Sequence, residues 1–213
     1  DSFQPDIAFN LLEEFDGVGV FDAHVASFLE TLHLPYTGCN PRGLMLAHHK
    51  AVAKMICRYH RIHVPNFHVF PIGRKVRRPK KLALPLLVKS LTEEGSAGIS
   101  QASVVHDDEK LAERVAFIHR RLGTDAIAEE YIDGRELYVG VLGNERLQTL
   151  PIWELVFANL REDAPRIATD KVKWDSAYQK RIGLESRRAE LSERMQREIP
   201  RLAKRIFRAL GLS

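Results

Sequence analysis

The sequence contains little cysteine and no long apolar run. Only two of its 213 residues are cysteines, Cys39 and Cys57, and their spacing matches no zinc or redox motif. We therefore expect both to be reduced thiols, as in a cytoplasmic protein. No stretch approaches the roughly 18 consecutive apolar residues that a transmembrane helix requires. The composition thus excludes a disulfide-rich secreted scaffold and predicts no membrane partner.

Motifs of several common enzyme classes are also missing. The chain has neither a GxxxxGK[ST] loop of the Walker type nor a GxSxG nucleophile elbow. Five histidines fall within residues 48–68, but neither an HExxH pattern nor paired cysteines accompany them. The sequence therefore predicts neither a Walker-type nucleotide site nor an elbow-type hydrolase, and we assign no metal-ligating residue.

Positive charge is moderately in excess. The formal net charge is +4, and much of the excess lies in residues 73–81 and 180–208. Such charge suits nucleic acid, but it suits a polyphosphate ligand equally well. Aromatic residues that would stack on bases are not interleaved with the basic ones. Nucleic acid is therefore the least favoured partner.

Hydrophobic periodicity predicts an α+β fold whose N-terminal part is α/β. The clearest helix is capped by Asp107 or Asp108 and stops at Gly123, with Leu111, Val115, Ile118 and Leu122 on its buried stripe. Strands are expected over 7–11, 67–70, 86–89, 99–105, 126–132, 136–143 and 147–155, and a long loop over 158–183. A last helix is expected from about Glu185 to Leu210, with Leu191, Met195, Ile199, Leu202, Ile206 and Leu210 facing inward.

The loop 89–98 joins two of these apolar runs and has two interpretations. Lys89 ends one run, and Gly95 and Gly98 let the backbone approach a ligand closely. Free backbone N–H groups beside a lysine can bind phosphate. The alternative is an ordinary hairpin turn, and the loop by itself does not decide between them.

The segment AEEYIDGRE (128–136) is similarly open. The end of its first strand, Glu129 to Ile132, can present backbone groups to an adenine edge, and Glu136 can bind ribose hydroxyls. The alternative is a hairpin that turns at Asp133-Gly134. Separately, Lys50, Lys89, Lys171 and Lys173 are typical surface lysines, whereas together they could neutralise a triphosphate.

Taken in order, five segments resemble the ATP-grasp ligases of the D-alanine–D-alanine ligase type. They are LPYTGCNPRGLMLAHHK (34–50), VPNFHVF (64–70), LLVKSLTEEGSAGIS (86–100), AEEYIDGRELYVGVLG (128–143) and DKVKW (170–174). The resemblance implies an ATP-grasp fold that is incomplete at both termini. Residues 1–47 would be the remainder of an N-terminal α/β domain, 48–125 the central subdomain with phosphate loop 89–98, and 126–213 the start of the C-terminal subdomain.

The resemblance also implies a reaction and a role for each matching residue. An ATP-dependent carboxylate–amine ligase forms an acyl phosphate, which the amine of an amino acid or small peptide then attacks. ATP would be bound by Lys50, Lys89, Glu93, Gly95, Ser96, Glu129, Glu130, Tyr131, Ile132 and Glu136. Lys173 would be catalytic, at the transferred phosphoryl group. A homodimer is compatible with the family.

The chain departs from the family pattern in three places. It begins after the family's first strand–helix–strand unit and ends before the strands that carry Mg²⁺ ligands, which we expect beyond Ser213. We therefore expect a fragment that is inactive by itself. FNLLEEFDGVGVFDAH stands where the family has a His-Gly and a Gly-Glu-Asp-Gly, and His49 replaces an acidic residue, so D-alanine is not implied as substrate. A non-catalytic nucleotide-binding module is the alternative.

Overall fold

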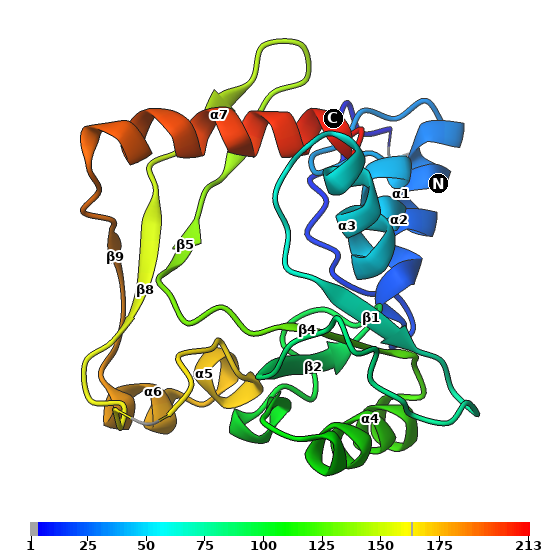
Figure 1. Cartoon of the computed structure of the whole chain (residues 1–213). Helices are drawn as coiled ribbons and strands as arrows, with labels where there is room; N and C mark the ends of the chain where they lie inside the picture. Colours follow the sequence, from blue (N-terminus) through cyan, green and yellow to red (C-terminus); the bar gives the residue numbers. More distant parts are fainter. Residues whose placement is uncertain (1–3, 163) are drawn as a thin grey trace.

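The computed structural model describes residues 4–162 and 164–213. It contains two separate antiparallel sheets, one of four strands and one of three, with a small two-stranded ribbon beside them. Figure 1 shows the first sheet between helices α3 and α4, and the second sheet below helix α7. The mixture of helices and sheets agrees with the α+β class predicted from the sequence.

The N-terminal part consists mainly of short helices. Helix α1 (Asp22–Thr31) follows a 3-10 turn (η1, Gly19–Phe21), and helix α2 (Pro41–His48) starts at Asn40, whose side chain accepts a hydrogen bond from the N–H of Gly43. Asn40 is thus the cap and Pro41 the first helical residue, positions that these two residue types favour. The strand predicted over 7–11 is reduced to a single bridge between Ala8 and Tyr36.

The four-stranded sheet has the order β1-β4-β2-β3. The strands are β1 (Phe67–Phe70), β4 (Ala126–Glu130), β2 (Leu86–Ser90) and β3 (Val104–Val105). The strand predicted over 99–105 is shorter than expected, because residues 101–103 form a 3-10 turn, η2 (Gln101–Ser103), closed by Ser100 and Ser103.

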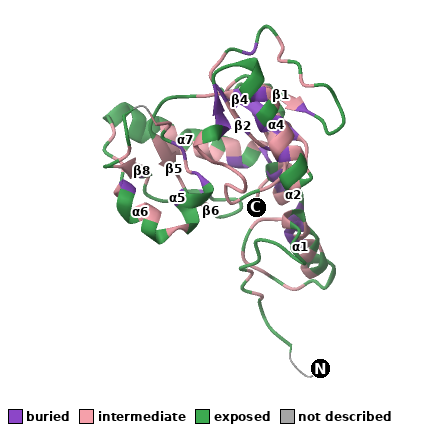
Figure 2. Cartoon of the chain, turned by 90° about the horizontal axis from the view of Figure 1, so that it is seen from below, coloured by how far each residue is buried: buried purple, intermediate pink, exposed green. Residues whose placement is uncertain are grey.

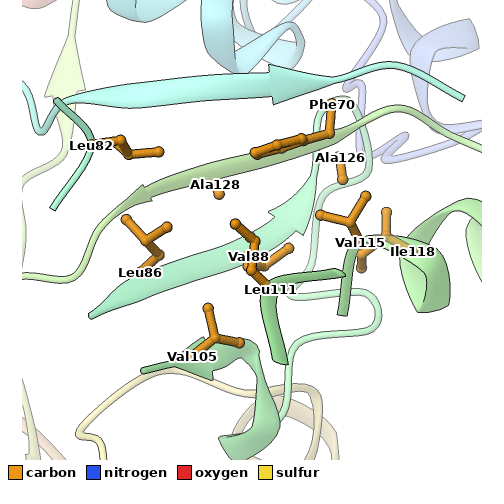
Figure 3. Packing of buried hydrophobic residues seen from close by; sticks show 10 residues of the cluster. All are labelled: Phe70, Leu82, Leu86, Val88, Val105, Leu111, Val115, Ile118, Ala126 and Ala128. Carbon is orange, nitrogen blue, oxygen red and sulfur yellow. The ribbon is translucent and has the colours of Figure 1, made fainter. Parts of the chain in front are cut away.

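One face of this sheet packs on helix α4 (Asp108–Leu122) and forms the main core. Figure 3 shows Leu86, Val88, Ala126 and Ala128 pointing toward Leu111, Val115 and Ile118 of α4. Asp107 caps the helix and Gly123, with a φ of 68°, ends it, as the sequence predicted. Figure 2 shows buried positions concentrated around β2, β4 and α4.

The opposite face of the same sheet packs on helix α3 (Lys50–Tyr59), with Ala51, Leu91 and Ile127 buried between them. Side chains alternate between the two faces of a strand. Val88 and Ala128 face the α4 core, so Lys89 and Glu129 emerge on the α3 side. This alternation places two charged residues inside the protein beside a helix that carries further lysines.

The hairpin that Asp133-Gly134 could have formed does not exist. Both edges of β4 are already paired, with β1 on one side and β2 on the other. The chain instead crosses to the second sheet, of order β5-β8-β9, made of β5 (Glu136–Tyr138), β8 (Trp153–Phe157) and β9 (Leu184–Arg188). The predicted subdomain boundary at residue 126 falls at the first residue of β4, a strand of the first sheet, and the division into subdomains stays a prediction.

Three further predictions are corrected in the C-terminal half. The strand predicted over 136–143 divides into β5 and β6 (Val141–Leu142), and that over 147–155 into β7 (Gln148–Thr149) and β8. The predicted loop 158–183 contains helices α5 (Asp170–Trp174) and α6 (Ser176–Ile182). Capping by Thr169 and Asp175 starts these two helices, a local signal that the aperiodic sequence obscured.

The last helix starts later than predicted. Residues 184–188 pair with β8, and α7 (Glu193–Ala209) begins after Ser192, whose side chain caps it. Only Phe207 is buried within α7, with Leu210 just after it, whereas Met195 and Leu202 are each more than one third exposed. The apolar stripe was therefore correct in spacing but wrong in burial over the first part of the helix.

Candidate active site

Lys89, Glu129 and Lys54 form a buried charge cluster on the α3 side of the first sheet. Lys89 Nζ donates to Glu129 Oε1 at 2.7 Å, and Lys54 Nζ lies 2.7 Å from Glu129 Oε2. Lys89 and Glu129 come from neighbouring strands, and Lys54 comes from α3, one turn after Lys50. The cluster therefore joins the strand that precedes the loop 89–98 to the strand predicted to hold adenine.

The two lysines keep Glu129 ionised. Burial by itself raises the pKa of Glu129, but the attraction of Lys89 and Lys54 outweighs it and holds the pKa below its usual value. The carboxylate has two positive neighbours, so the cluster keeps a net positive charge. The ammonium groups of such a cluster can donate to phosphate oxygens, and its carboxylate can accept from a hydrogen-bond donor on a base.

Lys50 lies beside the same strand end and is covered by the loop 89–98. Its backbone N–H bonds to the carbonyl of Leu91, and its Nζ donates to the carbonyl of Glu93 at 2.7 Å and to Glu94 Oε1 at 3.1 Å. Burial lowers the pKa of Lys50, and the carboxylate of Glu94 only partly offsets this effect. In this structure the carboxylate of Glu94 and the carbonyl of Glu93 thus bind the ammonium group of Lys50, whose contact with phosphate stays a prediction.

The segment that carries Lys173 is docked on the loop. The hydroxyl of Ser96 donates to the carbonyl of Ala168 at 2.7 Å, and the indole N–H of Trp174 donates to the carbonyl of Gly95 at 3.2 Å. The N–H of Asp170 also bonds to the carbonyl of Ile99 at 3.0 Å. Helix α5 therefore closes against residues 95–99 although the two segments are more than 70 positions apart in the sequence.

A cavity of about 540 Å³ lies where these elements meet. Lys173, Trp174, Glu94 and Gly95 line it from the loop side. Leu12, Glu13, Asp22, Leu44, Ala47 and His48 line it from the N-terminal part. Residues of all three predicted domains, 1–47, 48–125 and 126–213, thus border the cavity.

The predicted adenine segment follows directly from the cluster. The backbone N–H groups of Glu130 and Tyr131 bond to the carbonyls of Asn66 and Pro85. The side chain of Asn66 donates to Glu130 and lowers its pKa. Ile132 is 66% exposed. Glu129 has its side chain buried in the lysine cluster and its backbone inside the sheet. The adenine contact of residues 129–132 stays a prediction.

Glu136, the predicted ribose ligand, lies apart from the lysine cluster. It opens β5 of the second sheet, accepts a hydrogen bond from Tyr138 and lines a second cavity of about 440 Å³ with Arg135, Glu154 and Arg187. The structure therefore brings Lys50, Lys89, Glu93, Gly95, Ser96 and Glu129 together and leaves Glu136 in the other sheet. Its assignment to ribose stays a prediction.

Sequence reasoning missed Lys54, Glu94 and the pair Asp22–His48. Lys54 stands four residues after Lys50, so helical spacing could have placed both on one face. Asp22 and His48 have no such signal, since α1 and α2 bring them together from 26 positions apart. Among the described residues, no group of three or more His, Cys, Asp or Glu is arranged to hold a metal ion.

Lys54→Met should destabilise the protein by about 1–3 kcal/mol at pH 7, because the buried Glu129 loses one of its two cations. The folded pKa of Glu129 lies below its usual value, so the stabilisation exists at neutral pH and is lost as the carboxylate is protonated. The difference between wild type and variant should therefore shrink below about pH 4.

Urea denaturation at several pH values measures this difference. Lys110→Met is the matched control, since the side chain of Lys110 is 59% exposed and its pair with Glu113 lies within one helix turn. A Lys54→Met cost that does not change between pH 7 and acid would show that Lys54 acts through packing of its carbon chain and not through the charge of Glu129.

Comparison with known proteins identifies the family. Residues 57–213 match the family described as D-ala D-ala ligase C-terminus, which is most of the chain. The chain belongs to this ligase family. Its ATP-grasp fold is supported by a D-alanine–D-alanine ligase from Bacillus anthracis solved with ATP, which has a TM-score of 0.73 at 23% identity and covers 98% of this chain and 61% of that one.

Two curated relatives illustrate the range of the family. The chain is 34% identical over 172 residues to the uncharacterized protein y4sG of Sinorhizobium fredii, covering 81% of this chain and 47% of that protein. It is 30% identical over 195 residues to a D-alanine–D-alanine ligase of Desulforudis audaxviator, covering 89% of this chain and 59% of that protein. The chain thus spans about half the length of these two relatives. None of the helices in the described residues is long and apolar enough to cross a membrane.

Proposed function

We propose that this chain is the nucleotide-binding part of an ATP-dependent ligase that joins a carboxylate to an amine. The observation that carries the proposal is the convergence of Lys50 and Lys89 at the loop 89–98, with the helix of Lys173 docked on that loop. Lys50 lies at the start of α3 and Lys89 near the end of β2, and a loop that lies beside both lysines is suited to cover a polyphosphate. Family membership supplies the reaction class.

Each part of this arrangement has a task in phosphoryl transfer. Lys50 and Lys89 exchange their present carboxylate partners for phosphate oxygens, and Lys173 approaches the transferred group from α5. Catalysis of phosphoryl transfer rests mainly on positioning and on neutralising charge. The acyl phosphate then formed must be kept from water, a requirement that the contacts of Ser96 and Trp174 help to meet by closing α5 over the loop.

ATP would enter as its magnesium complex, MgATP. The described residues offer no cluster of metal ligands, so we derive no step from Mg²⁺ here, and ligands beyond Ser213 stay a prediction. Two free cysteines, Cys39 and Cys57, agree with a reducing, cytoplasmic location. We propose an amino acid or small peptide as the amine partner, without assigning D-alanine.

The basic segment 73–81 has a structural use that weakens the nucleic-acid alternative. Arg78 Nε lies 2.5 Å from Asp108 Oδ1, and its Nη1 donates to the carbonyl of Leu82 at 2.7 Å. This arginine thereby holds the segment against the start of α4. The contact accounts for one of the positive charges through folding alone.

Binding of MgATP should protect the loop 89–98 from proteolysis. The loop already contacts α5, and phosphate bridging Lys50 and Lys89 should hold it more firmly. Limited proteolysis with millimolar magnesium and a non-hydrolysable ATP analogue, followed by mass spectrometry of the first cleavage sites, measures the effect. The same analogue should not protect the connection near residue 144, which lies in the β6–β7 ribbon.

Phosphate release separates the two remaining interpretations. Release from MgATP that requires an amino acid, in the natural protein that carries this chain, supports a ligase and identifies its substrate class. Binding and loop protection without release under any amino acid of a D- and L-panel would instead favour a non-catalytic nucleotide module. If the protein does not bind MgATP and the loop 89–98 is not protected, the proposed function is refuted.

A further inference from the structure

His48 and Asp22 form a buried pair that nucleotide binding does not use. His48 is the last residue of α2 and Asp22 the first of α1, and their side chains are about nine-tenths buried. His48 Nε2 lies 3.0 Å from Asp22 Oδ2. A carboxylate oxygen accepts the hydrogen bond, so Nε2 carries a proton, and in the tautomer with this single N–H the lone pair lies on Nδ1.

The Nδ1 atom of His48 has no hydrogen-bond partner among the described residues. Buried polar atoms are normally satisfied, and an exception needs an explanation. A purely structural role, tying α1 to α2, needs only Nε2. The neighbouring His49 shows the contrast, because its Nδ1 accepts the N–H of Val52 and caps α3.

Glu94 is the group that stands over this nitrogen. Its Oε1 lies 3.9 Å from His48 Nδ1 and 3.1 Å from Lys50 Nζ, and its side chain is 54% exposed. Glu94 and His48 line the same cavity as Lys173. A phosphate that takes over Lys50 would compete with the carboxylate of Glu94 and would remove the cover from Nδ1.

We propose that the Asp22–His48 pair is the proton acceptor for the amine substrate, uncovered when nucleotide displaces Glu94. This assignment rests on the proposed ligase function. The charged groups around the ring are Asp22 on α1, Glu94 on the loop with Lys50 behind it, and Glu13 and Lys173 on the cavity wall. Asp22 holds the ring through Nε2 and leaves Nδ1 directed to the cavity side of the pair.

The proton transfer completes the chemistry of the second step. The amine nitrogen forms a bond to the carbonyl carbon of the acyl phosphate, and the carbon–oxygen bond to phosphate breaks, so that phosphate leaves with the electron pair. His48 Nδ1 takes one proton from the ammonium group before the attack, and the second proton lost by the nitrogen leaves with the phosphate. Asp22 stabilises the resulting imidazolium through Nε2, as a carboxylate does in other acid–base pairs.

His48→Gln provides the main test, because glutamine keeps an N–H for Asp22 but cannot accept the proton. In the natural protein that carries this chain, the variant should bind MgATP as wild type does. Its phosphate release with the best amino acid of a D- and L-panel should fall about 10²- to 10⁴-fold. The difference in phosphate-release rate between wild type and His48→Gln should become smaller at alkaline pH, because the amine is already deprotonated there.

Hydroxylamine is the matched nucleophile, since it is unprotonated at neutral pH and needs no base. Hydroxamate formation by His48→Gln should therefore stay near the wild-type rate. His49→Asn, which retains a capping side chain, is the matched variant and should lose no amine-dependent activity. The assignment would be overturned if His48→Gln released phosphate with the amino acid as fast as wild type does. It would also be overturned if the variant lost the same fraction of its rate with hydroxylamine as with the amino acid, at all pH values.

Labelling of the wild-type chain tests the proposal without any variant. Diethyl pyrocarbonate, which acylates unprotonated imidazole, should modify His48 slowly in the free protein and several-fold faster with a non-hydrolysable ATP analogue. The exposed His60 and His63 serve as internal references. Unchanged labelling in a protein that binds the analogue would refute the uncovering and leave the ligase proposal intact, whereas no binding at all would refute both.

Discussion

Lys89→Ala is expected to weaken MgATP binding about 10- to 100-fold, the effect of losing one charge-assisted contact to phosphate. The substitution has a second consequence, because Glu129 then keeps only Lys54 as a cation. Its carboxylate would lie beside the incoming phosphates with less neutralisation. Both effects weaken MgATP binding, so we expect this variant to show the largest loss of affinity among the single-lysine substitutions considered.

Isothermal titration with MgATP measures the affinity, and a thermal melt confirms that the variant is folded. Lys75→Ala is the control, because it removes the same charge from the exposed segment 73–81. We expect it to leave the affinity unchanged. If Lys75→Ala and Lys89→Ala weakened binding equally, the nucleotide would be held by general positive charge and not by the site described here.

Leu111→Ala is expected to reduce the free energy of unfolding by about 2–5 kcal/mol. Leu111 is 1% exposed and packs from α4 into the core shared with Leu86 and Val88, so the substitution leaves a cavity under the strand that ends in Lys89. The loss of packing therefore acts directly beneath the nucleotide site. Urea denaturation of wild type and variant gives the difference.

The control for this prediction makes the same chemical change on the surface. Leu202 lies in α7 and is 38% exposed, so Leu202→Ala should cost well under half as much. If Leu111→Ala and Leu202→Ala reduced the free energy of unfolding equally, the cluster between the first sheet and α4 would not be the principal core. Equal costs would also mean that the exposed face of α7 is covered in solution.

Local signals in the sequence predicted the elements of the first sheet well. Helix α4 has its cap, its buried stripe and its terminal glycine within 17 consecutive residues, 107–123, and all three were correct. The second half was predicted poorly, because β9 depends on a distant partner strand and the caps of α5 and α6 went unrecognised in an aperiodic segment. Residues 184–188 are charged and form a strand only because β8 offers an unpaired edge.

The candidate site shows the same division. The loop residues Gly95 and Ser96 and the lysines at 50 and 89 were recognisable from type and order along the chain. Whether 128–136 was a hairpin was not recognisable, since that depends on both edges of β4 being occupied. Nor could the sequence show that Glu129 turns its side chain, and not its backbone, toward Lys89.

By itself, then, the sequence determined the family and most elements of the first sheet, because these depend on residues that are neighbours along the chain. The role of the loop 89–98 as a phosphate loop stays a prediction. Only the tertiary structure decided which charges are paired. Lys54 with Glu129, Glu94 over Lys50, and Asp22 with His48 are each joined from separate elements. Strand alternation and helix packing bring them within about 3 Å, a distance at which burial makes ionic contacts strong.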